Sequence, residues 1–397
     1  MSADVELTLT LDSLAFGGEA VGRDAGGRVV FVAGGAPGDR VRARVTEHKR
    51  SFARAELVQV LTPGARVTPP CPIVDRCGGC PWQHVTVEAQ RAAKQAIVAR
   101  ALARSGAIVM PIAASEATLG YRTRARMSAR DGAVGFAARR SHAVVDVEAC
   151  LALDPALDLA LQAARRGLGR LIGEGGALAG LVRGGAVELA VTTGAGANRA
   201  QLAMAAAALE GRAGISRVTV DDAQAPAAGF AQANAVENER LRQLVREAAR
   251  ADGLRVLELY AGDGNFTRDL GAVAAGGVAV EGDRAAVARL RAAVAEAGWT
   301  VSAEPAERAV DRLARAGERF DVVVLDPPRA GAIEVVDGLA RLAPARIVYV
   351  SCDPMTLQRD LAALARHGYV ARTAWPVDMM PHTWHVEVVC LVERATG

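Results

Sequence analysis

The C-terminal part of the chain alternates between short apolar runs and longer segments in which apolar positions recur at helical spacing. From residue 253 onward, the apolar runs have the length of buried strands, and helical segments separate several of them. This succession is typical of a doubly wound, mostly parallel α/β sheet. We predict strands at 254–259, 277–281, 299–303, 320–325, 346–351, 369–375 and 386–392, and helices at about 284–297, 306–316, 333–342 and 355–367.

The N-terminal part has a different pattern, in which short alternating runs are separated by glycine turns. Residues 40–45 alternate arginine with small apolar residues, which places apolar side chains on one face of a strand and arginines on the other. Strands of this kind predict a small β-barrel at residues 1–62, ending at Pro63. A barrel that presents arginine on one face is suited to binding RNA.

The intervening residues 63–235 predict a central α+β domain that contains a cysteine loop. A helix is expected at 86–105, because no proline or glycine interrupts it before Gly106. Although the helix is assigned to the central domain, the alternative is that it packs on the C-terminal domain. The dipeptide Asp131-Gly132 predicts a hairpin turn within 120–149. The Ala- and Gly-rich stretch at 155–215 defines its elements only loosely, and we place the C-terminal domain at 236–397.

Composition narrows the class of protein. The chain has 397 residues, of which 51% are hydrophobic, and a formal net charge of +3. No apolar run reaches membrane-spanning length, and the N-terminus does not resemble a secretory signal, so a cytoplasmic location is expected, with no membrane and no obligate protein partner. Arginines nevertheless gather in two groups, which can either neutralise phosphates or form a solvated, arginine-rich surface. Their basic residues are Arg40, Arg42, Arg44, Lys49, Arg50 and Arg54, and Arg122, Arg124, Arg126, Arg130, Arg139 and Arg140.

Four of the six cysteines could together form a metal site. Cys71, Cys77 and Cys80 lie close together, and Cys150 can complete a set of four thiolates. Four thiolates can hold a [4Fe–4S] cluster or a structural zinc ion, and spacing leaves both open. A closed set of four ligands favours a structural role.

The stretch Ser351-Cys352-Asp353-Pro354 directly follows an apolar strand, and Pro354 favours a turn that exposes the thiol of Cys352. The glycine loop at 260–266 follows another strand, and Gly262 permits close backbone approach to a ligand such as S-adenosylmethionine. A thiolate beside a methyl donor can activate a ring carbon that is otherwise a poor nucleophile, such as C5 of uracil. This chemistry also requires a base that removes the C5 proton.

Acidic residues at strand ends are candidates for the remaining roles. Glu281 can bind the ribose hydroxyls of the donor, and Asp326 can reach the target base or the donor's amino group. Asp326 begins Asp-Pro-Pro-Arg, whose fourth residue is Arg329 instead of the aromatic residue found in many amino-methylating enzymes. Glu387 opens the last apolar strand and is the candidate base, with an ion pair to an arginine as the alternative.

Together these residues resemble the RNA uracil-5-methyltransferase family over nearly the whole chain. Residues 5–62 resemble its RNA-binding TRAM domain, and the four cysteines match the [4Fe–4S] ligands of its iron–sulfur members. The resemblance implies that Cys352 is the nucleophile and Glu387 the base, and that donor-binding positions include Gln232, Tyr260, Asn265, Glu281 and Asp326.

The resemblance implies methylation of C5 of a uridine in RNA, with S-adenosylmethionine as the donor. Members that have both a TRAM domain and a cluster are mostly similar to enzymes of the large ribosomal subunit, so 23S ribosomal RNA is favoured over transfer RNA. The alternatives are transfer RNA uracil methylation, RNA cytosine C5 methylation, and a non-catalytic RNA-binding protein. Cytosine enzymes usually have proline directly before the cysteine, whereas here Ser351 precedes Cys352.

Overall fold

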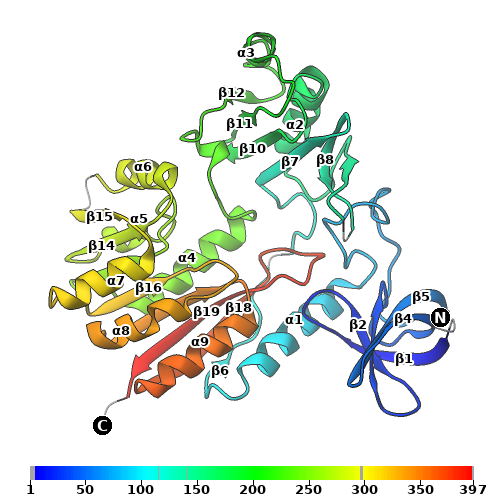
Figure 1. Cartoon of the computed structure of the whole chain (residues 1–397), viewed down its shortest axis with the longest axis horizontal. Helices are drawn as coiled ribbons and strands as arrows, with labels where there is room; N and C mark the ends of the chain where they lie inside the picture. The colour runs from blue at the N-terminus through cyan, green and yellow to red at the C-terminus, as the bar shows by residue number, and fades with distance from the viewer. Residues whose placement is uncertain (1–4, 115, 140, 296–297, 396–397) are drawn as a thin grey trace. The chain divides into compact units, whose positions relative to one another are not determined.

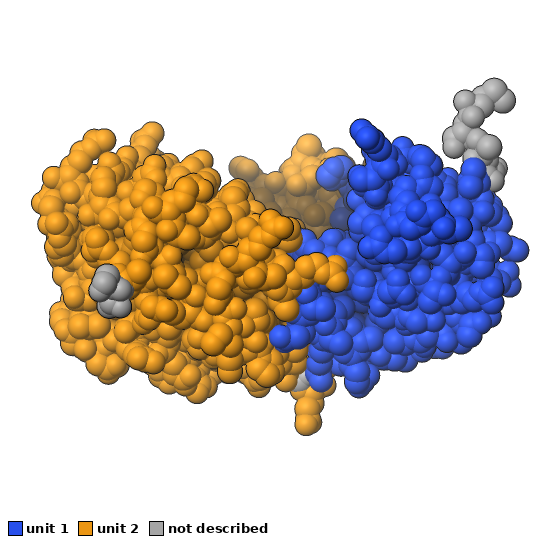
Figure 2. Space-filling view, turned by 90° about the horizontal axis from the view of Figure 1, so that it is seen from below, with its two compact units in different colours: residues 1–97, 136–145, 380–385 blue, residues 98–135, 146–379, 386–397 orange. Residues whose placement is uncertain are grey.

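The structure is a computed structural model that describes residues 5–114, 116–139, 141–295 and 298–395. The chain forms two compact units, coloured separately in Figure 2. Unit 1 comprises residues 1–97, 136–145 and 380–385, and unit 2 comprises 98–135, 146–379 and 386–397. Two later segments of the chain therefore belong to the N-terminal unit. The three-domain division at 62/63 and 235/236 stays a prediction.

Unit 1 contains a closed five-stranded barrel in the order β1-β2-β3-β5-β4. Along β4 the arginines at 40, 42 and 44 are exposed, while Val41 and Ala43 are buried in the barrel core. The predicted N-terminal barrel and its apolar and arginine faces are therefore confirmed. Its strands are β1 (Glu6–Leu14), β2 (Ala20–Arg23), β3 (Val29–Ala33), β4 (Arg40–His48) and β5 (Phe52–Thr62).

A buried carboxylate closes the barrel at one end. Asp39 is fully buried and accepts hydrogen bonds from the backbone N–H groups of Ala36 (2.8 Å) and Gly64 (2.9 Å). It also forms an ion pair with Arg66, with Nη2 and Oδ2 2.6 Å apart. Burial by itself raises the pKa of Asp39, but the hydrogen bonds from Arg66, Gly64 and Ala36 outweigh it and hold the pKa below 3.8.

The predicted helix at 86–105 is present as α1 (Val87–Leu102). The boundary between the two units falls inside it, after Ile97. In unit 1, Ala93 of α1 packs with Trp82 and Val85 against the barrel core. In unit 2, Val98 and Leu102 belong to the core of the C-terminal sheet. One continuous helix thus contributes to the core of each unit.

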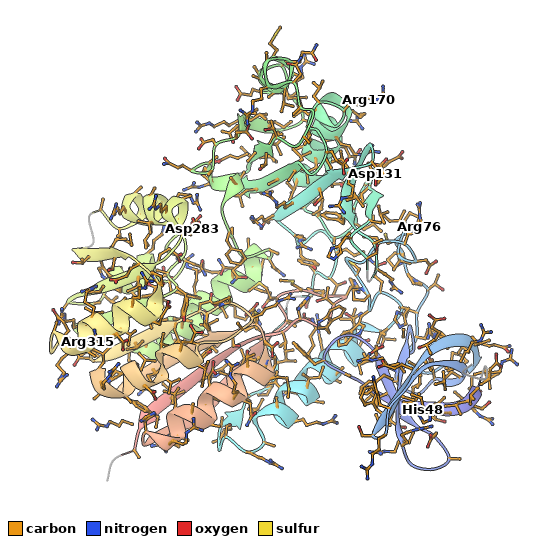
Figure 3. All side chains as sticks on the ribbon, in the orientation of Figure 1. His48, Arg76, Asp131, Arg170, Asp283 and Arg315 are labelled. Atoms are coloured by element: carbon orange, nitrogen blue, oxygen red, sulfur yellow. The ribbon has the colours of Figure 1, made fainter. Side chains whose placement is uncertain are left out.

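A six-stranded sheet in the order β12-β11-β10-β7-β8-β9 occupies the middle of the chain. Asp131 and Gly132 have positive φ values of 50° and 76°, the conformation of a tight hairpin turn between β7 and β8, so the predicted hairpin is confirmed. Asp131 is labelled in Figure 3. The elements are β7 (Arg124–Arg130), β8 (Ala133–Ala137), β9 (Val144–Asp146), α2 (Pro155–Leu168), β10 (Ala177–Arg183), β11 (Ala186–Thr192), α3 (Arg199–Ala207) and β12 (Ile215–Val220).

The C-terminal sheet has eight strands in the order β15-β14-β13-β16-β17-β19-β18-β6. Neighbours from β15 to β17 are parallel, and β19 is antiparallel to both β17 and β18. The strands are β6 (Ile108–Val109), β13 (Arg255–Leu259), β14 (Gly276–Glu281), β15 (Trp299–Ala303), β16 (Val322–Leu325), β17 (Arg346–Ser351), β18 (Tyr369–Val377) and β19 (Glu387–Arg394).

Helices pack against this sheet as the alternating pattern predicts. Within unit 2, α7, α8 and α9 lie side by side over core residues that include Leu257, Leu325 and Tyr349 (Figure 1). The helices are α4 (Ala235–Ala249), α5 (Thr267–Gly271), α6 (Arg284–Ala293), α7 (Ala306–Arg315), α8 (Val336–Leu342) and α9 (Pro354–Arg366). A short 3-10 turn, η2 (Ile333–Val335), precedes α8, and another, η1 (Pro226–Ala228), precedes α4. The predicted doubly wound domain is confirmed.

Two expectations concern features outside this core. Of the second arginine group, Arg140 lies outside the described residues. Among the residues that the structure describes, no helix is both long enough and apolar enough to cross a membrane.

We expect Asp39→Ala to destabilise unit 1 by about 3 kcal/mol, because it removes one partner of a buried ion pair and leaves two backbone N–H groups unsatisfied. Because the folded pKa of Asp39 is lowered, its stabilising contribution is complete above its ordinary pKa and is lost as the pH falls through the folded pKa. Chemical unfolding monitored by circular dichroism measures the loss.

The matched control is Glu6→Ala, which breaks the exposed ion pair with Arg42. We expect it to cost at most about 1 kcal/mol. Equal destabilisation by the two variants would contradict the role given to Asp39.

Candidate active site

The carboxyl ends of the parallel strands place several predicted residues in one row. The β13–β14 register pairs Leu259 with Val280, so the next residues, Tyr260 and Glu281, are neighbours. The β13–β16 register pairs Leu259 with Leu325, so Asp326 follows on the other side of Tyr260. Ligands of doubly wound sheets bind at this edge.

The antiparallel register of β17 and β19 brings Cys352 next to Glu387. These strands pair from Arg346 with Glu393 to Ser351 with Val388, and one more step along this register sets Cys352 opposite Glu387. Glu387 is also the first residue of β19 and pairs with Val377 of β18. The thiol and the carboxyl therefore come from adjacent strands at the same edge as Asp326.

Local structure holds Cys352 just before a helix. Asp353 is the N-cap of α9, and its Oδ1 accepts hydrogen bonds from the N–H groups of Met355 (2.8 Å) and Thr356 (3.2 Å). Pro354 occupies the first turn, which suits its fixed φ. Cys352 therefore lies directly before the N-cap of α9.

Burial raises the pKa of each of these groups. Burial, together with the smaller effects of Glu387 and Asp326, raises the pKa of Cys352 to about 12. Burial also raises the pKa of Glu387 to about 8 and that of Asp326 to about 7. Arg329 acts in the opposite direction and lowers the pKa of both Cys352 and Glu387.

The loop that carries Arg329 is anchored by a buried carboxylate in α9. Oδ2 of Asp360 accepts hydrogen bonds from the N–H of Ala332 (2.7 Å) and the hydroxyl of Tyr349 (2.7 Å). Arg359 donates to the carbonyl of Ala330 at 2.7 Å. In the sequence, Arg329 stands out only because it replaces the aromatic residue of many amino-methylating enzymes. Its electrostatic effect depends on this loop geometry, for which the sequence has no signal.

The glycine loop between β13 and α5 adopts left-handed backbone conformations. Tyr260, Gly262 and Gly264 have φ values of 60°, 56° and 86°. The N–H of Gly262 donates to Oε2 of Glu281 at 2.8 Å, which joins the loop to the end of β14. Oε1 of Glu281 accepts the N–H of Asp283 at 2.7 Å, and Asp283, labelled in Figure 3, caps α6.

A Cβ atom built on Gly262 would meet no atom within 4 Å, so the backbone here borders open space. A ligand can therefore approach the main chain at this point.

Other residues of the glycine loop bind neighbouring elements. The side-chain amides of Asn265 and Asn238 exchange two hydrogen bonds, of 2.9 Å and 3.0 Å, which tie the loop to α4. Asp263 forms an ion pair with Arg289 of α6, with a distance of 2.8 Å. Asn265, a predicted donor-binding residue, thus also has a structural partner.

The segment Phe230-Ala231-Gln232-Ala233-Asn234 leads into α4. Gln232 is half-buried. Asn234 is the N-cap of α4, and its Oδ1 accepts the N–H of Glu237 at 3.2 Å. Phe230 is 67% exposed, and the guanidinium of Arg124 lies 5.9 Å from the centre of its ring.

Sequence analysis missed Glu258, a buried acid inside the apolar strand β13. Burial raises its pKa to about 8, and its Oε2 has no hydrogen-bond partner among the described residues. Hydrogen bonding from Thr267, in α5, lowers this pKa and so opposes the effect of burial. An acid flanked by Leu257 and Leu259 is a signal that could have identified this position.

The predicted metal ligands are divided between the units. Cys71, Cys77 and Cys80 belong to unit 1, and Cys150 belongs to unit 2. The N–H of Gly79 donates to Sγ of Cys77 at 3.4 Å. Within the described ranges, no group of three or more His, Cys, Asp or Glu side chains is arranged to hold a metal ion.

A family model described as tRNA (Uracil-5-)-methyltransferase matches residues 197–395, and a TRAM domain model matches residues 5–58. A curated protein of Halomonas elongata, named 23S rRNA (uracil(1939)-C(5))-methyltransferase, is 36% identical over 97% of this chain and 89% of its own length. The chain belongs to the RNA uracil-5-methyltransferase family. It is therefore a methyltransferase enzyme with an N-terminal TRAM domain, as the sequence predicts.

A second curated relative agrees with this assignment, and a solved structure supports the fold. A protein of the same name from Pectobacterium atrosepticum is 34% identical over 98% of this chain and 94% of its own length. The solved tRNA (uracil-54, C5)-methyltransferase of Pyrococcus abyssi, in complex with S-adenosyl-L-homocysteine, has a TM-score of 0.72. It is 22% identical and covers 97% of this chain and 99% of its own, so it supports the fold, including the methyltransferase sheet.

Proposed function

We propose that this enzyme transfers a methyl group from S-adenosylmethionine to C5 of a uridine in 23S ribosomal RNA, at the uridine equivalent to the one named for its relatives. The observation that carries the proposal is the β17–β19 register, which sets a thiol beside a carboxyl at the ligand-binding edge of the sheet. The names of the curated relatives support ribosomal RNA as the substrate. The target uridine must leave its stack to reach this edge.

In this proposal Cys352 is the nucleophile. Its sulfur bonds to C6 of the uracil ring, and the electrons of the C5–C6 double bond move to form an enolate, whose C5 becomes nucleophilic. C5 accepts the methyl group of S-adenosylmethionine as the bond between that methyl group and the sulfonium sulfur breaks, which leaves S-adenosylhomocysteine. Because burial raises the pKa of Cys352 to about 12, the thiol must pass its proton to a neighbouring base as the substrate binds, and we assign this acceptor role to the carboxylate of Asp326. Arg329 favours the thiolate, since it lowers the pKa of Cys352.

Glu387 is the proposed base for the second half of the reaction. Its carboxylate takes the proton from C5, the C–H electrons restore the C5–C6 double bond, and the bond between C6 and sulfur breaks. A pKa raised to about 8 suits this role, since a stronger base accepts a carbon-bound proton more readily. Asp326, with its pKa raised to about 7, can donate a hydrogen bond to the uracil ring or bind the donor.

The residues around the glycine loop fit the methyl donor. The backbone at Gly262 borders open space, and Glu281 at the end of β14 is placed to bind ribose hydroxyls. The buried Oε2 of Glu258 lacks a partner that the cationic end of a donor would supply. We assign donor contacts to Gln232, Tyr260, Gly262, Asn265, Glu281 and Asp326.

We also propose that Cys71, Cys77, Cys80 and Cys150 are the ligands of a [4Fe–4S] cluster, with structural zinc as the alternative. Thiolates suit both, and the hydrogen bond from the N–H of Gly79 to Sγ of Cys77 stabilises a negatively charged sulfur. When bound, the cluster would supply cross-links within the chain. Separately, we propose that the protein is cytoplasmic and that its domain boundaries lie at 62/63 and 235/236.

We expect Cys352→Ala to abolish covalent capture of RNA that contains 5-fluorouridine, because fluorine at C5 cannot be removed by a base and the wild-type adduct persists. The experiment compares a 23S rRNA fragment with a transfer RNA, each with S-adenosylmethionine, on denaturing gels. Cys390→Ala is the matched control, since Cys390 is fully buried in β19.

Capture by Cys352→Ala at the wild-type level would disprove the role of Cys352. Capture of transfer RNA in preference to the ribosomal fragment would change the substrate. Mass analysis of the nucleosides made from unmodified RNA separates 5-methyluridine from 5-methylcytidine.

We expect Glu387→Gln to accumulate methylated protein–RNA adducts on unmodified RNA, with release slowed by about 10²- to 10⁴-fold. In the wild type, release in single-turnover reactions should become faster as the pH rises toward about 8, because the deprotonated carboxylate is the active form. The variant should lose this pH dependence. Normal release by Glu387→Gln would exclude Glu387 as the base.

We expect anaerobically purified protein to contain about four iron atoms per chain, and Cys150→Ser to lower the iron content while Cys390→Ser leaves it unchanged. Metal analysis and visible absorption measure both. Stoichiometric zinc without iron would favour the zinc alternative.

A further inference from the structure

The segment that leads into Glu387 belongs to unit 1, whereas Glu387 belongs to unit 2. Residues 380–385 cluster with the barrel and the start of α1, and only Val386 separates this segment from Glu387. We call residues 380–385 the base loop. Its contacts within unit 1 come from α1, from Trp82 and from the barrel.

Gln90 of α1 binds the centre of the base loop. Its Oε1 accepts the N–H of His382 at 2.8 Å, and its Nε2 lies 3.1 Å from Nδ1 of the same residue. The Nε2 group also donates to the carbonyls of Trp82 (3.1 Å) and Val85 (2.8 Å). Gln90 is 1% exposed, so these bonds form away from water, where an unmade bond is costly.

Lys94, one turn further along α1, binds the start of the base loop. Its side chain is completely buried, and Nζ donates to the carbonyl of Met380 at 2.9 Å. The same carbonyl accepts the hydroxyl of Thr383 at 2.7 Å, and Oγ1 of Thr383 accepts the N–H of His385 at 3.2 Å. A buried ammonium is expensive, which indicates that this contact has a specific use.

The base loop contains a backbone conformation that needs such support. His382 has a φ of 63°, in the left-handed region that residues with a Cβ rarely adopt. Its N–H is held by Gln90, and its carbonyl accepts the N–H of Trp82 at 2.9 Å. Strained residues of this kind persist where surrounding contacts determine them, and they concentrate at functional sites.

The barrel holds the other end of the base loop through Trp384. This side chain packs against the barrel core, and a Cβ atom built on Gly18 would lie 2.5 Å from its Cε3 atom. The indole N–H of Trp82 donates to the carbonyl of Gly18 at 3.0 Å. The same turn of the barrel therefore contacts both tryptophans.

We propose that Gln90 and Lys94, together with the Gly18–Trp384 contact, are positioning elements that aim Glu387 for removal of the C5 proton. The proposal rests on the proposed roles of Cys352 and Glu387. The base loop is covalently joined to Glu387, whereas Cys352 is held by β17 and the cap of α9. Release of the base loop should therefore impair the second half of the reaction and spare the first.

The test measures the two halves of the reaction separately in the variants Gln90→Met and Lys94→Met. Adduct formation with 5-fluorouridine RNA reports attack and methyl transfer, and adduct accumulation on unmodified RNA reports slow release. We expect both variants to form the fluorinated adduct at the wild-type rate. On unmodified RNA, release should slow by roughly 10- to 100-fold, less than in Glu387→Gln, because the base is present but misplaced.

Arg100→Met is the control on the same helix. Arg100 is exposed in the last turn of α1, so the variant removes a cation without touching the base loop. We expect wild-type rates in both assays.

A second pair of variants approaches the base loop from the barrel. Gly17 and Gly18 both have left-handed φ values, of 106° and 95°, so alanine strains the backbone at either position. Only at Gly18 does the new Cβ strike Trp384, since a Cβ at Gly17 meets nothing within 4 Å. We expect Gly18→Ala to accumulate adducts on unmodified RNA and Gly17→Ala to behave as wild type.

The outcomes separate this proposal from the proposed function. A wild-type protein that forms no adduct with fluorinated RNA refutes the proposed function before any variant is compared. If the wild type forms it, and the Gln90, Lys94 and Gly18 variants lose adduct formation and release in equal proportion, the contacts only stabilise the fold and the proposal is overturned. Unchanged release in all three variants also overturns it.

Discussion

The antiparallel pairing of β17 with β19 is the constraint on which the candidate active site depends. An otherwise parallel sheet brings only the carboxyl ends of its strands to the ligand-binding edge. Because β19 runs in the opposite direction, its first residue, Glu387, meets the residue that follows β17, Cys352. If β19 ran parallel to β17, the carboxyl of Glu387 would lie at the opposite edge of the sheet, away from Cys352. The thiol and the carboxyl that we propose as nucleophile and base thus become neighbours through the direction of one strand.

Burial determines how these neighbours behave before substrate arrives. Desolvation raises the pKa of Cys352, Glu387 and Asp326, which lowers the charge that the three groups carry together and so weakens the repulsion between them. Arg329 is the opposing influence, and Asp360 anchors the loop that carries it. When a uracil ring enters, its hydrogen-bonding edges can shift protons among Cys352, Glu387 and Asp326. This arrangement suits a reaction that consumes a thiolate first and a carboxylate afterwards.

The distribution of contacts in unit 1 gives the barrel a second role beside RNA binding. Gly18, Trp82, Gln90 and Lys94 all hold the short segment before Glu387. Buried polar bonds and a left-handed residue are costly unless every partner is present. The barrel and the start of α1 therefore contribute to the geometry of the base through the peptide chain itself.

The sequence by itself determined the elements and much of the chemistry, because apolar runs, turn residues such as Asp131-Gly132 and the residues around Cys352 and Glu387 act through near neighbours. Tertiary structure decided what joins distant positions: the pairing of Asn265 with Asn238, the burial of Glu258, and the bond from Gln90 to His382, which are 292 positions apart. A single sequence records residue types and local spacing. Which buried donor meets which acceptor is settled only when strands and helices pack, since the cost of an unsatisfied polar group appears only after water has been excluded.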